Sequence, residues 1–274
     1  MSQYYRHYDA GKWQARGFWR DLGDSFRFHP LWRAQAMQDV KNRYRRSWLG
    51  PFWITISMLA LIAGLGPLYG QLFKQPLQTY LPHVAVGVIM WSFLSSTTTE
   101  LCSALHGRPD LLQSSSLPVG SYILRVITRN LIVLAHNCVV ALIVLLFAGT
   151  KVSIATLLFV PALLAIVIAF VFYGYAISMI AARYRDVESL VATVTQLAFF
   201  LSPIVWRAEQ LPVERRFWIQ ANPFAWMIDL VRAPVLNDPV QPGSWPLLLM
   251  LMVVACISAV LVYSKCRHRI SHWV

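Results

Sequence analysis

Long stretches without a charged side chain dominate this chain. Six of them run for eighteen or more residues without Asp, Glu, Lys or Arg: Gly50–Phe73, Gln75–Thr99, Asn130–Thr150, Val152–Ala182, Ser189–Trp206 and Pro239–Ser264. A helix needs about 20 apolar residues to cross the hydrocarbon core of a bilayer. The pattern therefore predicts an all-α integral membrane protein with six transmembrane helices.

The composition agrees and leaves no room for a separate globular domain. Hydrophobic residues make up 57% of the chain and charged residues 13%, which is outside the range of ordinary soluble domains. We expect an N-terminal cytosolic or interface segment, residues 1–49, followed by a transmembrane domain, residues 50–274. Ten Lys or Arg precede Gly50, unlike the short basic region of a secretory signal peptide, so the segment should stay in the mature protein.

The formal net charge of +12 is unevenly distributed. With six crossings, the basic residues of the N-terminal segment, of the turn after the fourth crossing and of the tail fall on one side. On the other side, the four Arg of residues 207–238 are matched by four carboxylates. Excess Lys and Arg mark the cytoplasmic side of a membrane protein, so we expect both termini in the cytoplasm and no nucleic-acid partner.

The sequence lacks motifs for catalysis. It contains no Gly-x-x-x-x-Gly-Lys-Ser/Thr loop, no His-Glu-x-x-His and no Gly-x-Ser-x-Gly, which are the signatures of nucleotide, zinc-protease and hydrolase sites. Its four Cys show no paired spacing, so no disulfide framework or zinc site is predicted. We expect no catalytic residue, metal or cofactor on this chain, and uphill transport would draw on another subunit or on an ion gradient.

Residues 36–48 form an amphipathic pattern when laid on a helix. One side gathers Ala36, Met37, Val40, Tyr44 and Trp48, and the polar side includes Asp39, Arg43, Arg45 and Arg46. Such a helix lies flat at the level of the lipid headgroups, with its arginines toward phosphates or a cytosolic partner. The alternative is a plain topology signal before the first crossing. Pro30 fits the start of the helix.

Three ionisable residues border the second and third crossings. Arg125 and Arg129 precede the apolar run from Asn130, and Glu100 is the only carboxylate in an otherwise apolar helix. We expect the arginines to snorkel to the surface along their stems rather than to contact a substrate, and Arg125 or Arg129 can pair with Glu100. We favour structural pairing for Glu100 over proton coupling, because a single carboxylate near a surface is a poor relay.

The polar residues 106–120 connect these two crossings. Pro109 at a first helical position and Pro118 beyond it predict a small cytosolic helix that contains Arg108, Asp110 and Gln113. Such a helix would be a docking site for another protein, and the alternative is a plain connecting loop.

Residues 207–238 are too apolar for a free outer loop. Asn222 is a good N-cap, Pro223 fits the first helical position and Pro234 should end the run. We predict helices over 213–221 and 223–232 that form a re-entrant hairpin in the outer leaflet. On the second helix Phe224, Met227, Ile228 and Val231 share a face, whereas Asp229 and Arg232 point elsewhere. With Trp218 and Trp226, Phe224 and Met227 are candidates to close an outer gate.

Four aromatic residues lie deep in the predicted crossings, namely Trp91, Phe93, Tyr173 and Tyr175. Aromatic faces without nearby charge suit a ligand with apolar C–H faces and neutral hydroxyls, such as a sugar chain. The alternative is ordinary packing between helices, which is the commoner role of such residues.

Three segments share a family pattern. They are residues 39–53 (DVKNRYRRSWLGPFW), residues 183–187 (RYRDV), and residues 202–206 (SPIVW) continuing through Leu211-Pro212 to Asn222-Pro223. In consistent order over residues 31 to about 235, they resemble the membrane-spanning subunit of the ABC-2 type export family. Within it they resemble the permeases that export O-antigen and capsular polysaccharides.

The resemblance implies a type V exporter-like fold in the bacterial inner membrane. It implies a homodimer of six-helix subunits that works with two copies of a separate cytosolic ATPase, which binds Mg-ATP, and a lipid-linked polysaccharide as substrate. The interface helix and the loop around Arg108 would contact the ATPase, and the short helices after Trp206 would form the outer gate. Related teichoic-acid exporters leave the glycan open.

Two functions of other classes are alternatives. A membrane-embedded enzyme of glycan or lipid assembly would have to use Glu100, His106 and Arg108 as its site. A scaffold subunit that transports nothing would tolerate changes at Trp226.

Overall fold

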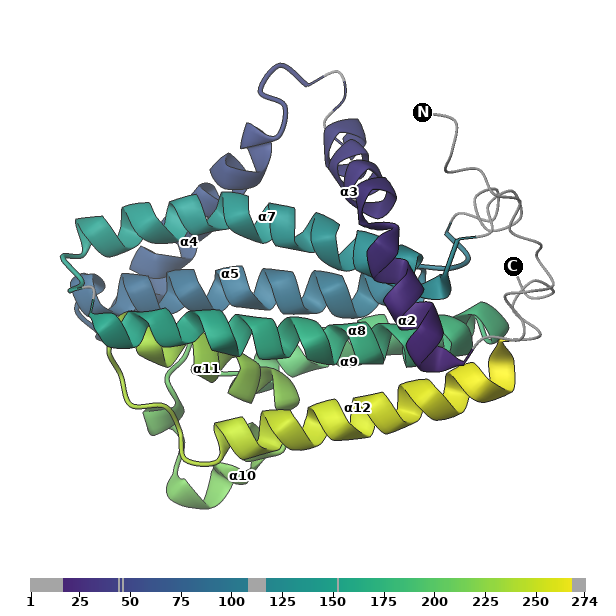
Figure 1. The fold of residues 1–274 in the computed structure, drawn as a ribbon. Helices are drawn as coiled ribbons and strands as arrows, with labels where there is room; N and C mark the ends of the chain where they lie inside the picture. The colour runs from purple at the N-terminus through teal and green to yellow at the C-terminus, as the bar shows by residue number, and fades with distance from the viewer. Residues whose placement is uncertain (1–16, 44, 46, 108–116, 152, 268–274) are drawn as a thin grey trace.

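The computed structural model describes residues 17–43, 45, 47–107, 117–151 and 153–267, and within these ranges the chain is helical without a strand. Four long helices run side by side as a bundle: α5 (Leu77–Cys102), α7 (Val119–Phe147), α8 (Phe159–Arg183) and α12 (Ser244–Cys266) (Figure 1). The helix α4 (Phe52–Leu72) packs on α5 and α7, and the short 3-10 turn η1 (Ile154–Leu158) leads into α8.

Five helices in the described ranges are long and apolar enough to cross a membrane: α4, α5, α7, α12 and the continuous run Ile154–Arg183. The chain is therefore a multi-pass, all-helical membrane protein, as the hydrophobic pattern predicts. The helix α5 is the most enclosed of the five. In its apolar stretch 67% of the residues are buried, compared with 22% in α4 and 17% in α12. Outer faces of α4 and α12 are free for lipid or for other chains.

The predicted fifth crossing contains a shorter helix than expected. The helix α9 (Asp186–Leu201) has 16 residues, and residues 202–206 continue without helical structure. At 1.5 Å per residue this helix spans about 24 Å, which is less than the roughly 30 Å hydrocarbon core. Pro203 explains the stop, because a proline disfavours helical backbone in the residue before it, and Ser202 is extended with φ −93° and ψ 140°.

The helix of the third crossing starts earlier than its apolar run. It begins at Val119, so Arg125 and Arg129 lie within its first turns, where they face other helices.

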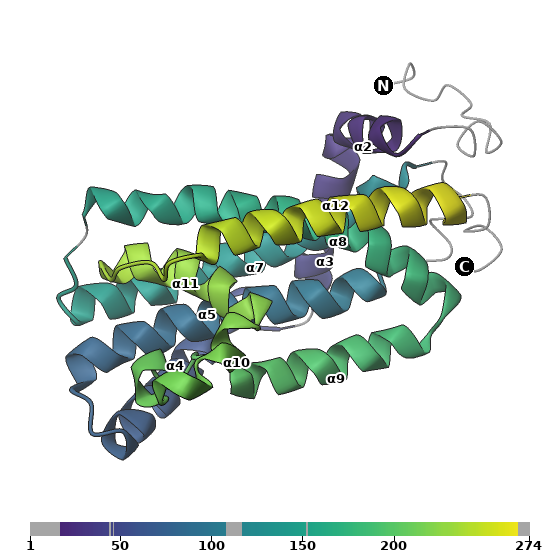
Figure 2. The same ribbon diagram turned by 90° about the horizontal axis from the view of Figure 1, so that it is seen from below.

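The described part of the N-terminal segment contains two helices, α2 (Phe18–Arg27) and α3 (His29–Arg43). The start predicted at Pro30 agrees with α3, but the predicted helical pattern to residue 48 extends beyond the end of α3 at Arg43. Ala36 and Val40 are buried as expected, but Met37 is 44% exposed, and Trp48 lies beyond the helix with 98% exposure. The reason is tertiary, since α3 packs against α7, its buried residues are Ala36 and Val40, and the chain leaves the helix before Gly50, whose φ is +53°. Figure 2 shows α2 next to the last turns of α12.

Residues 207–238 contain 3-10 turns at Ala208–Gln210 (η2) and Val213–Arg215 (η3), a single turn α10 (Phe217–Gln220), and α11 (Pro223–Leu236). Asn222 caps α11 as predicted, because its side chain accepts a hydrogen bond from the Phe224 N–H at 3.0 Å. Pro234 does not end the helix, since it lies in the last turn, where it removes only one backbone hydrogen bond. The helix ends at Leu236, and the next residue, Asn237, has a left-handed backbone with φ 59°.

Candidate functional site

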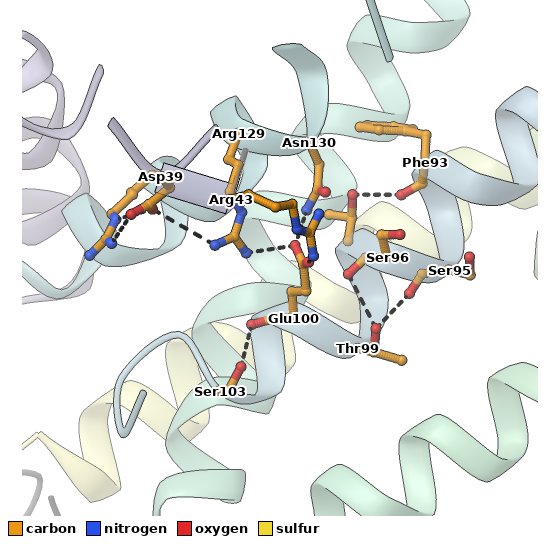
Figure 3. A network of polar contacts seen from close by, with 12 residues as sticks. Asp39, Arg43, Phe93, Ser95, Ser96, Thr99, Glu100, Ser103, Arg129 and Asn130 are labelled. Carbon is orange, nitrogen blue, oxygen red and sulfur yellow. Dashed lines mark hydrogen bonds and ion pairs between the residues drawn. The ribbon is translucent and has the colours of Figure 1, made fainter. Parts of the chain in front are cut away.

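A cluster of charged side chains joins α3 to α5 and α7 at the end of the bundle where α7 begins. We call Asp39, Arg43, Glu100, Arg125, Arg129 and Asn130 the charged cluster (Figure 3). Its members come from the two neighbouring crossings α5 and α7 and from α3, which α4 separates from them in the sequence. Three arginines face two carboxylates in it, so the described cluster carries a formal excess of one positive charge.

The most buried contact of the cluster is the pair Asp39–Arg125. The Nε of Arg125 donates to Asp39 Oδ2 at 2.7 Å and its Nη2 donates to Oδ1 at 2.6 Å. The two side chains are only 10% and 9% exposed. Two parallel charge-assisted hydrogen bonds of this kind fix both direction and distance, so Asp39 holds α3 against α7.

The remaining contacts extend the charged cluster to α5. Arg129 Nη2 donates to Glu100 Oε2 at 2.6 Å, and its Nη1 lies 3.7 Å from Asp39 Oδ2. Asn130 also donates to Glu100 Oε2, at 2.7 Å, and Arg43 Nη2 lies 3.8 Å from Oε1. Arg129 therefore bridges the carboxylate of α3 and that of α5.

The charged cluster joins two groups of residues for which the sequence predicted separate roles: the polar side of the interface helix, and the ionisable residues of the second and third crossings. The expected pairing of Glu100 occurs with Arg129, whereas Arg125 pairs with Asp39. Snorkelling was the wrong expectation for Arg125, because its guanidinium is buried. Arg43 keeps 60% of its side chain exposed and Arg45 is exposed beyond the helix, whereas the predicted contact residues Arg46, Arg108, Asp110 and Gln113 lie outside the described residues.

Asp21 of α2 is a wholly buried carboxylate that sequence analysis missed. Its Oδ1 accepts from the backbone N–H of Val119 at 3.2 Å, and its Oδ2 accepts from the N–H of Gly120 at 3.1 Å and from the Tyr175 hydroxyl at 2.7 Å. Burial raises the pKa of Asp21 above its usual range, and these hydrogen bonds oppose that shift. Asp21 thus satisfies two of the free N–H groups at the start of α7 and links them to α8.

A groove of about 390 Å³ lies between α5 and α9. Its lining consists of aromatic rings, small side chains, hydroxyls and one amide: Trp91, Ser95, Ser96, Thr99, Ala192, Thr195, Gln196, Phe199 and Phe200. None of these described lining residues is ionisable. Trp91 is the centre of its aromatic side, with ring centroids 5.5 Å from Phe199 and 5.3 Å from Phe224 of α11.

The four aromatic residues predicted to touch a substrate do not lie together. Trp91 lines the groove, but Phe93 and Tyr175 are buried in the bundle core and are 3% and 0% exposed. Tyr173 is half-buried on α8, 6.4 Å from the Phe170 ring. Burial removes Phe93 and Tyr175 from the accessible surface of the chain, and the hydroxyls of Ser95, Ser96 and Thr99 take their place beside Trp91.

Directly after the last residue of α9, buried side chains hold the non-helical residues 202–206. Arg232 donates to the Pro203 carbonyl at 2.6 Å, the Tyr80 hydroxyl donates to the Val205 carbonyl, and His83 lies 3.4 Å from the Trp206 carbonyl. Irregular backbone at membrane depth is tolerated only where protein groups satisfy it. These contacts therefore stabilise the break that Pro203 introduces.

Arg232 and Asp229 are both 7% exposed, which corrects the expectation that they point away from the packed face of α11. Asp229 accepts from the Gln241 N–H at 2.9 Å and lies 3.4 Å from Ser244 Oγ. In the sequence, the buried contacts of α11 are indicated by the two charged residues, Asp229 and Arg232, that stand in this otherwise apolar helix.

The four candidate gate residues differ in their exposure. Trp218 is 59% exposed, Trp226 is half-buried and Met227 is buried, whereas Phe224 packs on Trp91.

Comparison with known proteins places this architecture in a family. The family model described as ABC-2 type transporter matches residues 30–236. A relative from Myxococcus xanthus, named O-antigen export system permease protein RfbA, is 23% identical over 252 residues, which cover 89% of this chain and 93% of that protein. A protein of the same name from Klebsiella pneumoniae is 21% identical over 85% of this chain and 90% of its own length. The chain belongs to the ABC-2 type transporter family.

Proposed function

We propose that this chain is the membrane-spanning permease of an ATP-driven exporter that moves a lipid-linked polysaccharide, O-antigen or capsule, across the bacterial inner membrane. The observation that carries the proposal is the uncharged groove between α5 and α9, found in a member of a transporter family whose relatives are named for O-antigen export.

The chemistry of the groove fits a glycan. Sugar rings present apolar C–H faces that pack on aromatic rings, and hydroxyls that exchange hydrogen bonds with neutral polar groups. Trp91 and Phe199 supply the aromatic faces, and Ser96, Thr99 and Gln196 supply donors and acceptors. A groove without fixed charge holds no ligand strongly at one point, which suits the passage of a long chain of repeated units.

A second copy of the chain would complete the pathway. All residues of α9 are described, and only Thr195 among them is buried. Its exposed apolar side chains include Leu190, Val194, Leu197 and Phe200. We propose that α9 is the one remaining crossing, the fifth in chain order, with residues 202–206 completing its path through the bilayer, and that the α9 wall faces the partner subunit in a homodimer.

Both termini belong on the cytoplasmic side in this proposal. The helix α2 lies beside the end of α12, which supports placing the two ends of the described chain on one face of the membrane. Two copies of a cytosolic ABC ATPase, each binding Mg-ATP, would act at that face. Their contacts would be Arg43, Arg45 and Arg46, together with Arg108, Asp110 and Gln113 of the connecting segment.

On the other face, the segment around α10 and α11 would act as the outer gate. Phe224 of α11 packs against Trp91 at one end of the groove, so a movement of α11 would change access to it. Trp218, Trp226 and Met227 are the other candidate gate residues.

Reconstitution tests the proposal. The purified permease and its ATPase, placed together in proteoliposomes, should move a lipid-linked glycan to the opposite leaflet only when ATP is hydrolysed. The matched control is the same complex with an ATPase variant that binds but cannot hydrolyse ATP. Movement without the ATPase, or ATP hydrolysis by the permease alone, would contradict the proposal.

A further inference from the structure

Asn222 links two elements through the two ends of its side-chain amide. Its Oδ1 accepts from the Phe224 N–H at 3.0 Å and caps α11, whereas its Nδ2 donates to Ser202 Oγ at 2.8 Å. Ser202 directly follows the last residue of α9. Both residues are buried, with Asn222 7% and Ser202 1% exposed. One side chain therefore caps the start of α11 and joins it to the end of α9.

The Ser202 hydroxyl continues this link into α9. Its Oγ donates to the Ala198 carbonyl at 2.7 Å. Because a hydroxyl has one hydrogen to donate, Ser202 acts toward Asn222 as the acceptor. The amide is thereby held in one orientation, with its nitrogen toward Ser202 and its oxygen toward the start of α11. Three hydrogen bonds form an unbroken line from the last turn of α9 to the first turn of α11.

Two aromatic rings at the ends of this line contact Trp91 in the groove. Phe199 follows Ala198 on α9, and its ring centroid lies 5.5 Å from that of Trp91. Phe224, whose N–H binds Asn222, has its ring centroid 5.3 Å from that of Trp91. Both rings reach one indole only while the end of α9 and the start of α11 keep their spacing. The line of hydrogen bonds sets that spacing.

A second contact keeps α11 attached to the end of α9 when the Asn222 bond is removed. Arg232, in the third turn of α11, donates to the Pro203 carbonyl at 2.6 Å. Loss of the bond between Asn222 and Ser202 should therefore free only the first turn of the helix, which contains Phe224. The expected result is a displaced ring rather than an unfolded segment.

We propose that Asn222 is a positioning residue for glycan export: its bond to Ser202 holds Phe224 against Trp91 and so sets the aromatic end of the groove between α5 and α9. This inference rests on the proposed function, which takes that groove as the path of the glycan. Aromatic rings act through close contact of their faces and edges, so the spacing of these rings decides how tightly the groove binds each sugar unit.

Two substitutions break the same bond from opposite sides. Asn222→Ser keeps an N-cap, since serine caps a helix about as well as asparagine, but it lacks the amide nitrogen that reaches Ser202. Ser202→Ala removes the acceptor and leaves the cap of α11 intact. Ser258→Ala is the matched control, because the Ser258 hydroxyl donates to the Val254 carbonyl of its own helix, α12, at 2.8 Å.

Fluorine NMR tests the contact without reference to transport. In protein labelled with fluorotryptophan, the Trp91 resonance is the one that disappears in Trp91→Phe, and Phe224→Leu gives its position without the neighbouring ring. Asn222→Ser and Ser202→Ala should each move the Trp91 resonance at least half of the way to that position, while Ser258→Ala leaves it in place. An unmoved resonance in either of the two variants would overturn the inference.

Transport kinetics test the role. In the reconstituted complex, Asn222→Ser and Ser202→Ala should each raise the KM for the lipid-linked glycan at least threefold, while kcat stays within twofold of wild type. Such a split indicates lost binding rather than a lost catalytic step, whereas a folding defect reduces the amount of active complex and leaves KM unchanged. The double variant should have the KM of the single variants, because the same bond is absent in all three.

The outcomes separate this inference from the proposed function. A wild-type complex that exports, combined with an unchanged KM in both variants, overturns the inference alone. The same holds if the double variant multiplies the two single effects, or if Ser258→Ala raises KM as much as they do. A wild-type complex without ATP-dependent export overturns the proposed function, and the role of Asn222 in export with it.

Discussion

The buried pair Asp39–Arg125 should contribute far more to stability than an exposed ion pair of the same residue types. The perturbation is a double-mutant cycle with Asp39→Asn, Arg125→Gln and the combination of both. Each single change leaves one buried charge without its bidentate partner. The double variant leaves two neutral amides, which can hydrogen-bond to each other.

The structure sets the expected magnitudes. Removing one member of a buried ion pair destabilises a protein by about 3–5 kcal/mol. Arg125→Gln should lie near the lower end, since Arg129 Nη1 is only 3.7 Å from Asp39 Oδ2 and compensates part of its charge. Asp39→Asn should have the larger effect, because Glu100 is already engaged by Arg129 and Asn130. We expect a coupling energy of at least about 2 kcal/mol, within the range for residues in direct contact.

The assay is the free energy of unfolding of the detergent-solubilised protein, measured by circular dichroism under identical conditions for all variants. The control cycle uses Asp24 and Arg27 of α2, which lie 3.6 Å apart, with the Arg27 side chain 83% exposed and that of Asp24 14% exposed, so that only the arginine is well solvated. Exposed pairs on one helix contribute about 0.3–0.5 kcal/mol. If the effects at Asp39 and Arg125 add to within about 0.5 kcal/mol, the pair does not hold α3 against α7 and the reasoning fails.

Four further changes have defined outcomes. Gly120→Ala should lower the thermal midpoint sharply, and adding Tyr175→Phe should restore part of the loss, because the new Cβ would lie 2.1 Å from the Tyr175 hydroxyl. The raised native pKa of Asp21 means that its contribution is complete below the ordinary carboxyl pKa of about 3.9 and is lost as the pH rises through the native pKa. The unfolding free energy of wild type relative to Asp21→Asn should therefore fall as the pH is raised from about 4, and a pH-independent difference would contradict this. Arg232→Ala should destabilise the protein by about 1–3 kcal/mol, since it leaves the buried Pro203 carbonyl without its donor, and an unchanged midpoint would speak against that contact. Gln196→Ala should lower the rate of glycan export with little effect on stability, because Gln196 is an exposed groove residue; equal export rates would remove it from the pathway.

The long hydrophobic runs predict the membrane helices well because a crossing is a local property of the sequence. Five of the six runs contain helices long enough to span a bilayer. The cap at Asn222 was also predictable, since an N-cap depends on residues within one turn. The fifth run, Ser189–Trp206, shows the limit of this reasoning. Its hydrophobicity continues to Trp206, but Pro203 ends the helix, and side chains from α5 and α11 hold the non-helical residues 202–206 in place.

The charged cluster was only half predictable. Pairing between Glu100 and an arginine of the next helix follows from their similar depth in adjacent crossings. The contact of Asp39 with Arg125 does not, because it depends on how α3 packs against α7, which no local pattern encodes. The same reason hides Asp21, an acidic residue on a short helix whose partners lie about 100 and 154 residues further along the chain.

The chemical character of the groove can be predicted from the sequence, but the residues that line it cannot. The sequence shows Trp91 and the hydroxyl-bearing residues after it, but it does not show which face of α5 packs into the bundle. In the structure that orientation buries Phe93, whereas Trp91 remains accessible. Tyr175 points to α2 because Asp21 binds its hydroxyl.

The position of the lipid-linked glycan in cells depleted of this chain tests the central claim most directly. The leaflet that holds the glycan is read by adding a glycan-binding probe to spheroplasts before and after the membrane is opened. A permease predicts that completed glycan accumulates on its lipid carrier at the cytoplasmic leaflet, reached only after opening. Loss of the completed glycan itself would mean that the chain takes part in assembly, and normal display at the outer leaflet would mean that it is not the exporter.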